Sequence, residues 1–357
     1  AGINLIGYAR AEMGVGESVR SAARAAKAAG LETALYGVEA HPKYRASDWS
    51  AGDLAASLPF PISILHVNAD QTPLVVSQLG ARLHSTRHRI GYWAWELEDF
   101  PERWMGAFDC VDEVWAPSDF CRAAIAAVSP KPVLRMPHAV DPVGPAKHSR
   151  DTLGLPPAAF TVLVAFDAMS VTQRKNPLAA IEAFRRAFSP GEDARLVLKV
   201  SHAEAAPAAM QALRAAAADP RITLIGRVMD REQMRSLIAH SDCLLSLHRS
   251  EGFGLILAEA MSAGKTVICT GYSGNMDFTW PGSALLVEYS LVPVGAGNDP
   301  YPADSLWAEP DPAHAAALLR QAYLEPALRE RVGEEGRRRI LRDFSAEAVG
   351  RAMRRRP

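Results

Sequence analysis

Short apolar stretches alternate with alanine-rich stretches of helical periodicity along most of the chain, and this alternation restricts the fold more than any other feature. Strands that alternate with helices form β-α-β units, so the pattern predicts parallel sheets with helices on both faces. The predicted strands are 2–7, 33–37, 62–67, 88–93, 112–116, 132–136, 160–166, 195–200, 222–226, 243–247 and 266–270. The predicted helices are 16–29, 71–81, 101–109, 118–128, 176–188 and 230–240.

The chain is long enough for two domains, since a single hydrophobic core stops growing before 357 residues. The alternation breaks at Pro142-Val143-Gly144-Pro145 and restarts near residue 160. We therefore predict an α/β protein with two doubly wound, Rossmann-like domains, 1–143 and 150–343. The final segment, 344–357, contains a candidate helix.

Composition excludes several classes of protein and site. The formal net charge is -1, which gives no basic surplus for nucleic-acid binding. The four cysteines form no C-x-x-C and no H-E-x-x-H occurs, so we expect no structural metal and free thiols in a reducing cytoplasm. No apolar run approaches the roughly 18 residues that cross a bilayer.

Residues 250–264 read SEGFGLILAEAMSAG and place Glu251 and Glu259 on either side of a glycine-rich turn and a helix start. The 3.6-residue period puts Glu259 about two turns beyond Glu251, so both can face one ligand. Carboxylates accept hydrogen bonds from hydroxyls, and a helix N-terminus favours an anion, a combination that suits a sugar nucleotide. The alternative is a capping acid followed by a solvated helix residue.

Two more motifs follow predicted strands. Arg174-Lys175 comes after strand 160–166, where fixed cations would stabilise a departing diphosphate; the alternative is an exposed basic pair in a loop. Gly14-Val15-Gly16 comes after the first strand, and its alternative is a tight turn into a helix. The chain lacks the full G-x-G-x-x-G pattern and an acidic residue at the end of strand 33–37, which argues against a dehydrogenase.

With these residues the chain resembles the retaining glycosyltransferases of family 4, the group 1 transferases with the GT-B fold. The resemblance is strongest over 226–278. It implies two domains facing across a cleft, with the C-terminal helix within 344–357 packing back onto the first domain. It also implies a nucleotide-diphosphate sugar donor, retention at the anomeric carbon, and no metal or other cofactor. The family pattern departs at Lys265-Thr266, where a proline is usual, and at Asp167, where many relatives carry an arginine.

The resemblance also implies residue roles. Glu259 would bind the ribose hydroxyls, and Glu251 with the following turn would hold the transferred sugar. Arg174 and Lys175 would bind the diphosphate, and with Glu251 they would be the catalytic residues. The remaining donor-binding candidates are Gly14, Gly16, Arg227, Gly252, Phe253, Gly254 and Leu255.

The loop 91–101 resembles a stretch of bacterial polysaccharide mannosyltransferases, which makes Trp95 and Glu96 candidates for the acceptor side and GDP-mannose the first donor candidate, before UDP-sugars. Aromatic faces and carboxylates suit a sugar acceptor. The alternative is that Trp93 and Trp95 are core residues. The resemblance implies a glycan or lipid-linked acceptor.

Four further hypotheses remain open. The helix face of Arg20, Arg24 and Lys27 is a candidate for weak docking at the inner face of a membrane, or an ordinary solvated face. His138 is interpreted as a hinge residue rather than a cleft residue. The loop 271–277 would face the phosphate or base, or be a simple turn. Alternative functions are an epimerase or phosphorylase of the same fold, or a non-catalytic nucleotide-sugar-binding protein.

Overall fold

The computed structural model describes residues 2–39, 45–156 and 159–356. The chain divides into two compact units, the first Ala1–Val140 with Arg342–Pro357 and the second Asp141–Leu341. The first domain predicted from the sequence ends at 143 rather than 140, and the second was predicted over 150–343 rather than 141–341. Ala1 and Pro357, which end two predicted ranges, lie outside the described residues.

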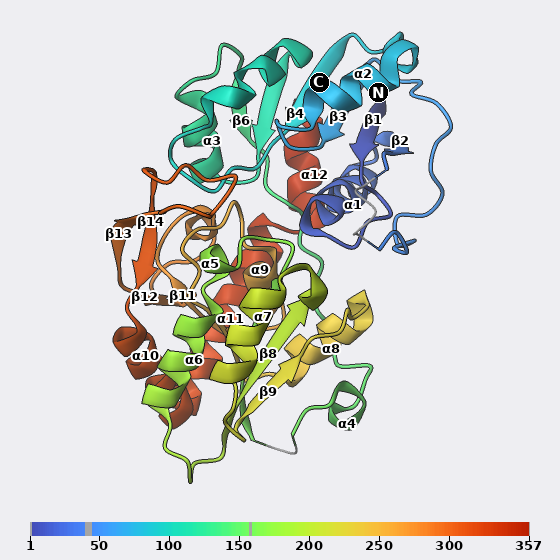
Figure 1. Cartoon of the computed structure of the whole chain (residues 1–357). Coiled ribbons are helices and arrows are strands. Elements are labelled where there is room, and N and C mark those ends of the chain that lie inside the picture. The colour runs from blue at the N-terminus through green and yellow to red at the C-terminus, as the bar shows by residue number, and fades with distance from the viewer. Residues whose placement is uncertain (1, 40–44, 157–158, 357) are drawn as a thin grey trace. The chain divides into compact units, whose positions relative to one another are not determined.

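The first unit is built on a parallel sheet with the strand order β2-β1-β3-β4-β5-β6 (Figure 1). Every residue of β1 is buried, as expected for a central strand covered on both faces. The strand order reverses direction between β1 and β3, which marks a topological switch point. The strands are β1 Gly2–Gly7, β2 Glu32–Gly37, β3 Ile62–His66, β4 His88–Tyr92, β5 Glu113–Ala116 and β6 Val133–Arg135.

The helices of the first unit include one from the far end of the sequence. They are α1 Gly14–Ala28, α2 Thr72–Leu79, η1 Gly80–Leu83, η2 Glu102–Cys110, α3 Asp119–Ala126 and α12 Ala346–Arg354. Helix α12 lies against α1 (Figure 1), and its residues Val349 and Met353 belong to the apolar core of the first unit. Gly350 permits this approach, because a Cβ there would lie 2.2 Å from the carbonyl oxygen of Ala25. The predicted helix 101–109 is a 3-10 helix, η2, and the predicted helix 71–81 changes to 3-10 geometry after Leu79.

The second unit contains a six-stranded parallel sheet and a separate antiparallel hairpin (Figure 1). The sheet order is β12-β11-β10-β7-β8-β9, so its switch point lies between β7 and β10. Its strands are β7 Phe160–Asp167, β8 Ala194–Ser201, β9 Ile222–Ile225, β10 Cys243–Ser246, β11 Thr266–Thr270 and β12 Leu285–Val287. The hairpin pairs β13 Tyr289–Pro293 with β14 Leu306–Pro310. The sequence pattern predicted the five strands β7 to β11 and none of β12 to β14.

The helices of the second unit connect these strands. They are α4 Arg150–Leu153, α5 Thr172–Lys175, α6 Pro177–Ala187, η3 Ala203–Ala205, α7 Pro207–Ala216, α8 Arg231–His240, α9 Leu255–Ser262, η4 Gly274–Asp277, α10 Pro312–Leu324 and α11 Pro326–Asp343. Asp230 caps α8 in a capping box with Gln233. Ligands of such sheets bind beyond the carboxyl ends of the strands at the switch point, which here means the segments after β7 and β10.

Candidate functional site

The segments that follow β7 and β10 bring two cations and one carboxylate together. Lys175, the last residue of α5, donates a hydrogen bond to Oε1 of Glu251, and Nη1 of Arg174 lies 3.4 Å from Oε2. Glu251 is 8% exposed and Arg174 5% exposed. Burial alone would raise the pKa of Glu251, but Lys175 and Arg174 outweigh it and lower the pKa to about 2. Glu251 is therefore ionised at neutral pH.

The turn that carries the two cations is fixed at both ends. Asn176 ends α5 with φ of 50°, a left-handed conformation that asparagine tolerates better than most residues. Pro177 then starts α6, where its missing N–H costs nothing. Nη1 of Arg174 donates to the carbonyl oxygen of Ser250 at 2.7 Å, and so ties the turn to the Glu251 loop.

The Glu251 loop depends on glycine at two positions. Gly254 precedes α9 with φ of 92°, a region that disfavours side chains. A Cβ on Gly274 would lie 2.2 Å from the carbonyl oxygen of Gly252, so the loop 271–277 packs directly against the Glu251 loop. The amide of Gly274 donates to the carbonyl oxygen of Glu251 at 2.9 Å. This amide therefore supports the loop. Contact of the other amides of 271–277 with a phosphate or base stays a prediction, and a simple turn stays its alternative.

The two glutamates occupy different local structures. Glu251 lies in the loop before α9, whereas Glu259 lies in the second turn of that helix and is half-buried. Of the residues between the two glutamates, Phe253 is buried and Leu255 is half-buried. Phe253 packs on Phe278 with ring centroids 5.1 Å apart. A shared ligand for the two carboxylates stays a prediction.

A buried histidine that the sequence analysis did not single out supports the same loop. His248 is fully buried, with Nδ1 3.0 Å from Oγ of Ser246 and Nε2 3.0 Å from Oδ1 of Asn275. Burial lowers the pKa of His248 and outweighs the opposing effect of Glu251. A neutral imidazole thus links β10 to the loop 271–277. Its one sequence signal is a histidine at the end of an apolar strand, three residues before Glu251.

The position where many relatives carry an arginine holds Asp167, at the end of β7. Its Oδ1 accepts a hydrogen bond from the amide of Met169 at 2.9 Å and lies 3.0 Å from Nδ1 of His202. Lys199 on β8 is buried, which lowers its pKa to about 8, and its Nζ donates to Oγ of Ser201 at 2.9 Å. Arg227, after β9, is exposed.

In the first unit, the two glycines of the predicted donor loop have different environments. Gly14 is the exposed first residue of α1, and a Cβ there would meet nothing within 4 Å. Gly16 is buried, and a Cβ there would lie 2.3 Å from the carbonyl oxygen of Ala11 and 2.9 Å from that of Tyr8. Gly16 is therefore required for the packing of the loop itself.

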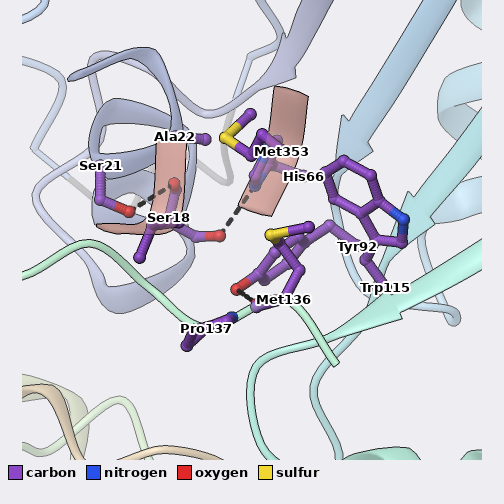
Figure 2. Close-up of a pocket in the computed structure, with 10 residues that line it drawn as sticks. Ser18, Ser21, Ala22, His66, Tyr92, Trp115, Met136, Pro137 and Met353 are labelled. Atoms are coloured by element: carbon purple, nitrogen blue, oxygen red, sulfur yellow. Dashed lines mark hydrogen bonds between the residues drawn. The ribbon is translucent and has the colours of Figure 1, made fainter. Parts of the chain in front are cut away.

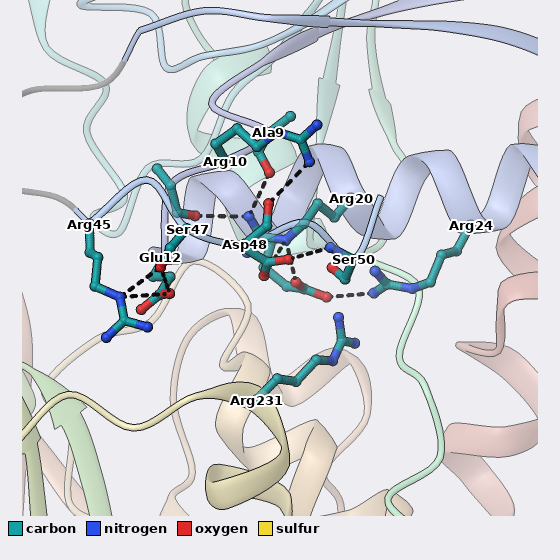
Figure 3. A network of polar contacts seen from close by, with 12 residues as sticks. Ala9, Arg10, Glu12, Arg20, Arg24, Arg45, Ser47, Asp48, Ser50 and Arg231 are labelled. Carbon is teal, nitrogen blue, oxygen red and sulfur yellow. Dashed lines mark hydrogen bonds and ion pairs between the residues drawn. The ribbon is translucent and has the colours of Figure 1, made fainter. Parts of the chain in front are cut away.

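The hypothesis of a basic membrane-docking face on α1 is wrong, because its central residue is not on the surface. Arg20 is 3% exposed, donates to the carbonyl oxygens of Ala9 and Ala11, and pairs with Glu17 and Asp48 at 3.0 and 3.1 Å (Figure 3). Arg24 also pairs with Glu17, at 2.5 Å, and of the three basic residues only Lys27 is exposed. None of the helices in the described ranges is long and apolar enough to span a bilayer.

The acceptor-side prediction for Trp95 is contradicted by its burial. The indole is 1% exposed, donates to the carbonyl oxygen of Asp99 at 2.7 Å, and packs edge-on against Trp104 with centroids 4.8 Å apart. Trp93 is also fully buried, so the alternative interpretation of both tryptophans as core residues is the one the structure supports. Glu96 is half-buried and remains a candidate for acceptor contact.

His138 lies against Tyr92, which lines a small buried cavity of the first unit together with His66 and Trp115 (Figure 2). The hydroxyl of Tyr92 donates to the carbonyl oxygen of Met136 at 2.7 Å and lies 3.3 Å from Nδ1 of His138. The ring of His66 stacks on Tyr92 at 4.6 Å, and its Nδ1 lies 2.8 Å from Oγ of Ser18. Nε2 of His66 is buried and has no hydrogen-bond partner among the described residues. Burial lowers the pKa of His66 to about 3 and that of His138 to about 4.

Residues 161–293 match the family model described as glycosyl transferases group 1. The match covers less than half of the chain and marks a segment of the second unit that is similar to group 1 glycosyltransferases. The matched range contains β7 from its second residue, α5 and β10 to β12, and therefore the whole Arg174, Lys175 and Glu251 cluster. No curated protein matched the sequence.

Solved structures that match most or nearly all of the chain show that it has the GT-B fold. Sucrose-phosphate synthase from Thermosynechococcus elongatus is 18% identical with a TM-score of 0.70, and the match covers 99% of this chain and 98% of that one. Anabaena HepE, in complex with UDP and glucose, is 13% identical with a TM-score of 0.68 and coverage of 99% and 98%. α,α-Trehalose 6-phosphate synthase from Burkholderia multivorans is 16% identical with a TM-score of 0.61 and coverage of 83% and 71%. At these identities the likeness establishes the fold.

Proposed function

We propose that the protein is a retaining glycosyltransferase that moves a sugar from a nucleotide-diphosphate donor to a hydroxyl group of a glycan or lipid-linked acceptor. The observation that carries the proposal is the cluster of Arg174, Lys175 and Glu251. It lies at the switch point of the second sheet, inside the segment that matches group 1 glycosyltransferases.

The cluster suits the departure of a diphosphate. Negative charge develops on the leaving phosphate as the anomeric C–O bond breaks, and fixed cations stabilise that charge most in the transition state. Lys175 and Arg174 supply these cations, so the proposed reaction needs no metal. Glu251, ionised and rigidly held, would accept hydrogen bonds from the sugar hydroxyls, and Glu259 from the ribose.

Retention follows, in this proposal, from displacement on one face of the sugar. The acceptor oxygen forms the new bond to the anomeric carbon on the face from which the phosphate leaves. The acceptor proton passes to the departing phosphate oxygen, which balances the step without a covalent enzyme intermediate. Glu96 in the first unit is the candidate contact for the acceptor.

We place UDP-sugars before GDP-mannose as donors. The support comes from the proteins of the same fold: HepE was solved with UDP-glucose, and the pneumococcal O-GlcNAc transferase GtfA with UDP and GlcNAc. The resemblance of the loop 91–101 to mannosyltransferases is the argument for GDP-mannose, and it weakens with the burial of Trp95.

Thermal-shift measurements with UDP, GDP, uridine and guanosine test the donor site, since a ligand that binds only the folded state raises the melting temperature. We expect UDP to raise it and uridine to leave it nearly unchanged. An absence of any shift with all nucleoside diphosphates would refute the proposal.

The reaction itself is tested by incubating UDP-sugars with a panel of glycan and lipid-linked acceptors and following UDP release. Release that depends on an acceptor, with a product of unchanged anomeric configuration by NMR, is the expected result. Product formed from the donor alone would indicate an epimerase or hydrolase, and an inverted product would contradict the proposed displacement.

A further inference from the structure

The β13–β14 hairpin adjoins the turn that carries Arg174 and Lys175, and Arg249 connects the two. The amide of Arg249 donates to the carbonyl oxygen of Arg174 at 2.7 Å. Its own carbonyl oxygen accepts from the amide of Ala308 on β14 at 3.0 Å. The backbone of Arg249 is thus held between α5 on one side and the hairpin on the other.

The side chain of Arg249 repeats this connection. Nη1 donates to the carbonyl oxygen of Gln173 in α5 at 2.6 Å, and Nε donates to Oε2 of Glu309 on β14 at 2.7 Å. The guanidinium also lies over the ring of Trp307 at 5.4 Å. Its planar set of donors serves a backbone carbonyl and a carboxylate at once, a geometry that lysine does not reproduce.

Glu309 reaches the other end of the same turn. Nδ2 of Asn176, the residue that ends α5, lies 3.4 Å from Oε1 of Glu309. Both ends of α5 are therefore tied to the hairpin, at Gln173 through Arg249 and at Asn176 directly. Tyr301, in the loop between β13 and β14, is buried with its ring 6.0 Å from the guanidinium carbon of Arg174.

A turn as short as α5 needs such support. It has four residues, and one helical turn fixes more backbone dihedrals than its hydrogen bonds repay, so it is not stable by itself. The two cations sit on its last two residues. Their positions are therefore set by whatever holds the turn from outside.

We propose that Arg249 and Glu309 are positioning residues for the diphosphate of the donor. They hold α5 so that Arg174 and Lys175 present their charges at fixed places, and the β13–β14 hairpin is the brace on which this depends. The proposal rests on the proposed function, because it presupposes that the two cations bind a diphosphate.

The test separates position from charge. Arg249→Ala removes a positive charge near the site and Glu309→Ala removes a negative one, so the double variant leaves the net charge unchanged. Calorimetric affinities for UDP and UMP are measured for the wild type, both single variants and the double variant. If the thermal-shift panel selects guanine, GDP and GMP replace them.

We expect the double variant to bind UDP about tenfold more weakly, because misplaced cations lose much of their interaction with the outer phosphate. UMP, which lacks that phosphate, should change by less than about twofold. A double variant with wild-type UDP affinity would overturn the proposal, since the pair would then act through charge alone. Equal losses for UDP and UMP would also overturn it, because they indicate a general structural role.

Two further variants keep the test decisive. Glu192→Gln is the control. It breaks the ion pair with Arg320 beside the amino end of β8, whereas the candidate site lies at the carboxyl ends of the strands. It should leave the ratio of UDP to UMP affinity unchanged. If the double alanine variant does not fold, the Arg249→Gln and Glu309→Gln pair is measured with the same expectation.

A wild-type protein that binds no nucleoside diphosphate would refute the proposed function and this inference with it. A wild-type protein that binds UDP, with an unaltered double variant, refutes this inference alone.

Discussion

Lowering the pH from 7 to 5 should destabilise the first unit through two buried histidines. His66 and His138 are 1% and 8% exposed, and burial lowers the pKa of each from 6.5, to about 3 and about 4. The folded unit therefore keeps both imidazoles neutral at a pH where the unfolded chain protonates them. Above pH 6.5 the two histidines are neutral in both states and cost no stability. As the pH falls from 6.5 toward 4 and 3, protonation stabilises the unfolded chain but not the folded unit, so the free energy of unfolding declines.

The size of the effect follows from the difference between the two states. At pH 5, which is about 1.5 pH units below 6.5, each of the two histidines carries close to one proton in the unfolded chain and almost none in the folded unit. At 1.36 kcal/mol per pH unit, this costs about 2 kcal/mol for each histidine and about 4 kcal/mol for both. That is a large part of the stability of a typical domain.

Urea unfolding at pH 7 and pH 5 measures the effect, in the wild type and in the variants His66→Asn and His138→Asn. Asparagine does not titrate, and its amide reaches the position of the Nδ1 atom that each histidine uses toward Ser18 or Tyr92. Each variant should lose about 2 kcal/mol of the pH dependence. His84→Asn, at an exposed histidine, is the control. A pH dependence that persists unchanged in the double asparagine variant would refute the reasoning.

Four substitutions test the glycine packing and the donor site. Gly16→Ala should lower the free energy of unfolding by about 1–3 kcal/mol, because its Cβ would overlap the carbonyl oxygen of Ala11. Gly14→Ala, where a Cβ meets no atom within 4 Å, should be nearly neutral. Equal effects of the two substitutions in urea unfolding would contradict the packing argument. Gly274→Ala should displace the Glu251 loop and reduce sugar transfer, and unaltered UDP release would show that the loop tolerates the change. Glu259→Ala should weaken UDP binding in calorimetry, and an unchanged dissociation constant would remove it from the ribose site.

The alternation of strands and helices was sufficient to predict two parallel α/β sheets, because buried parallel strands read as short apolar runs. The residues of the candidate site in the second unit could also be named, since Arg174, Lys175 and Glu251 follow strands whose carboxyl ends lie at one side of the sheet. The β13–β14 hairpin was not predicted. Its strand β13 is mostly exposed and apolar, so it shows no alternation between buried and solvent faces.

Side-chain burial was the part that sequence periodicity could not settle. Arg20 lies on a helix face with other basic residues, yet it is buried because Ala9 and Ala11 offer carbonyl oxygens and Asp48 a carboxylate from a distant loop. Trp95 follows a strand, where a ligand-facing aromatic would also lie, but Phe100 and Trp104 enclose it. In both cases the deciding partners come from packing beyond the local sequence.

The rate of UDP release from a UDP-sugar in the presence of acceptor, compared between the wild type and Lys175→Ala, tests the central claim most directly. The claim is that the cation of Lys175 stabilises the departing diphosphate. We predict a loss of about 100-fold or more in kcat for the alanine variant, with partial recovery in Lys175→Arg. A kcat close to that of the wild type in a folded Lys175→Ala protein would contradict the account.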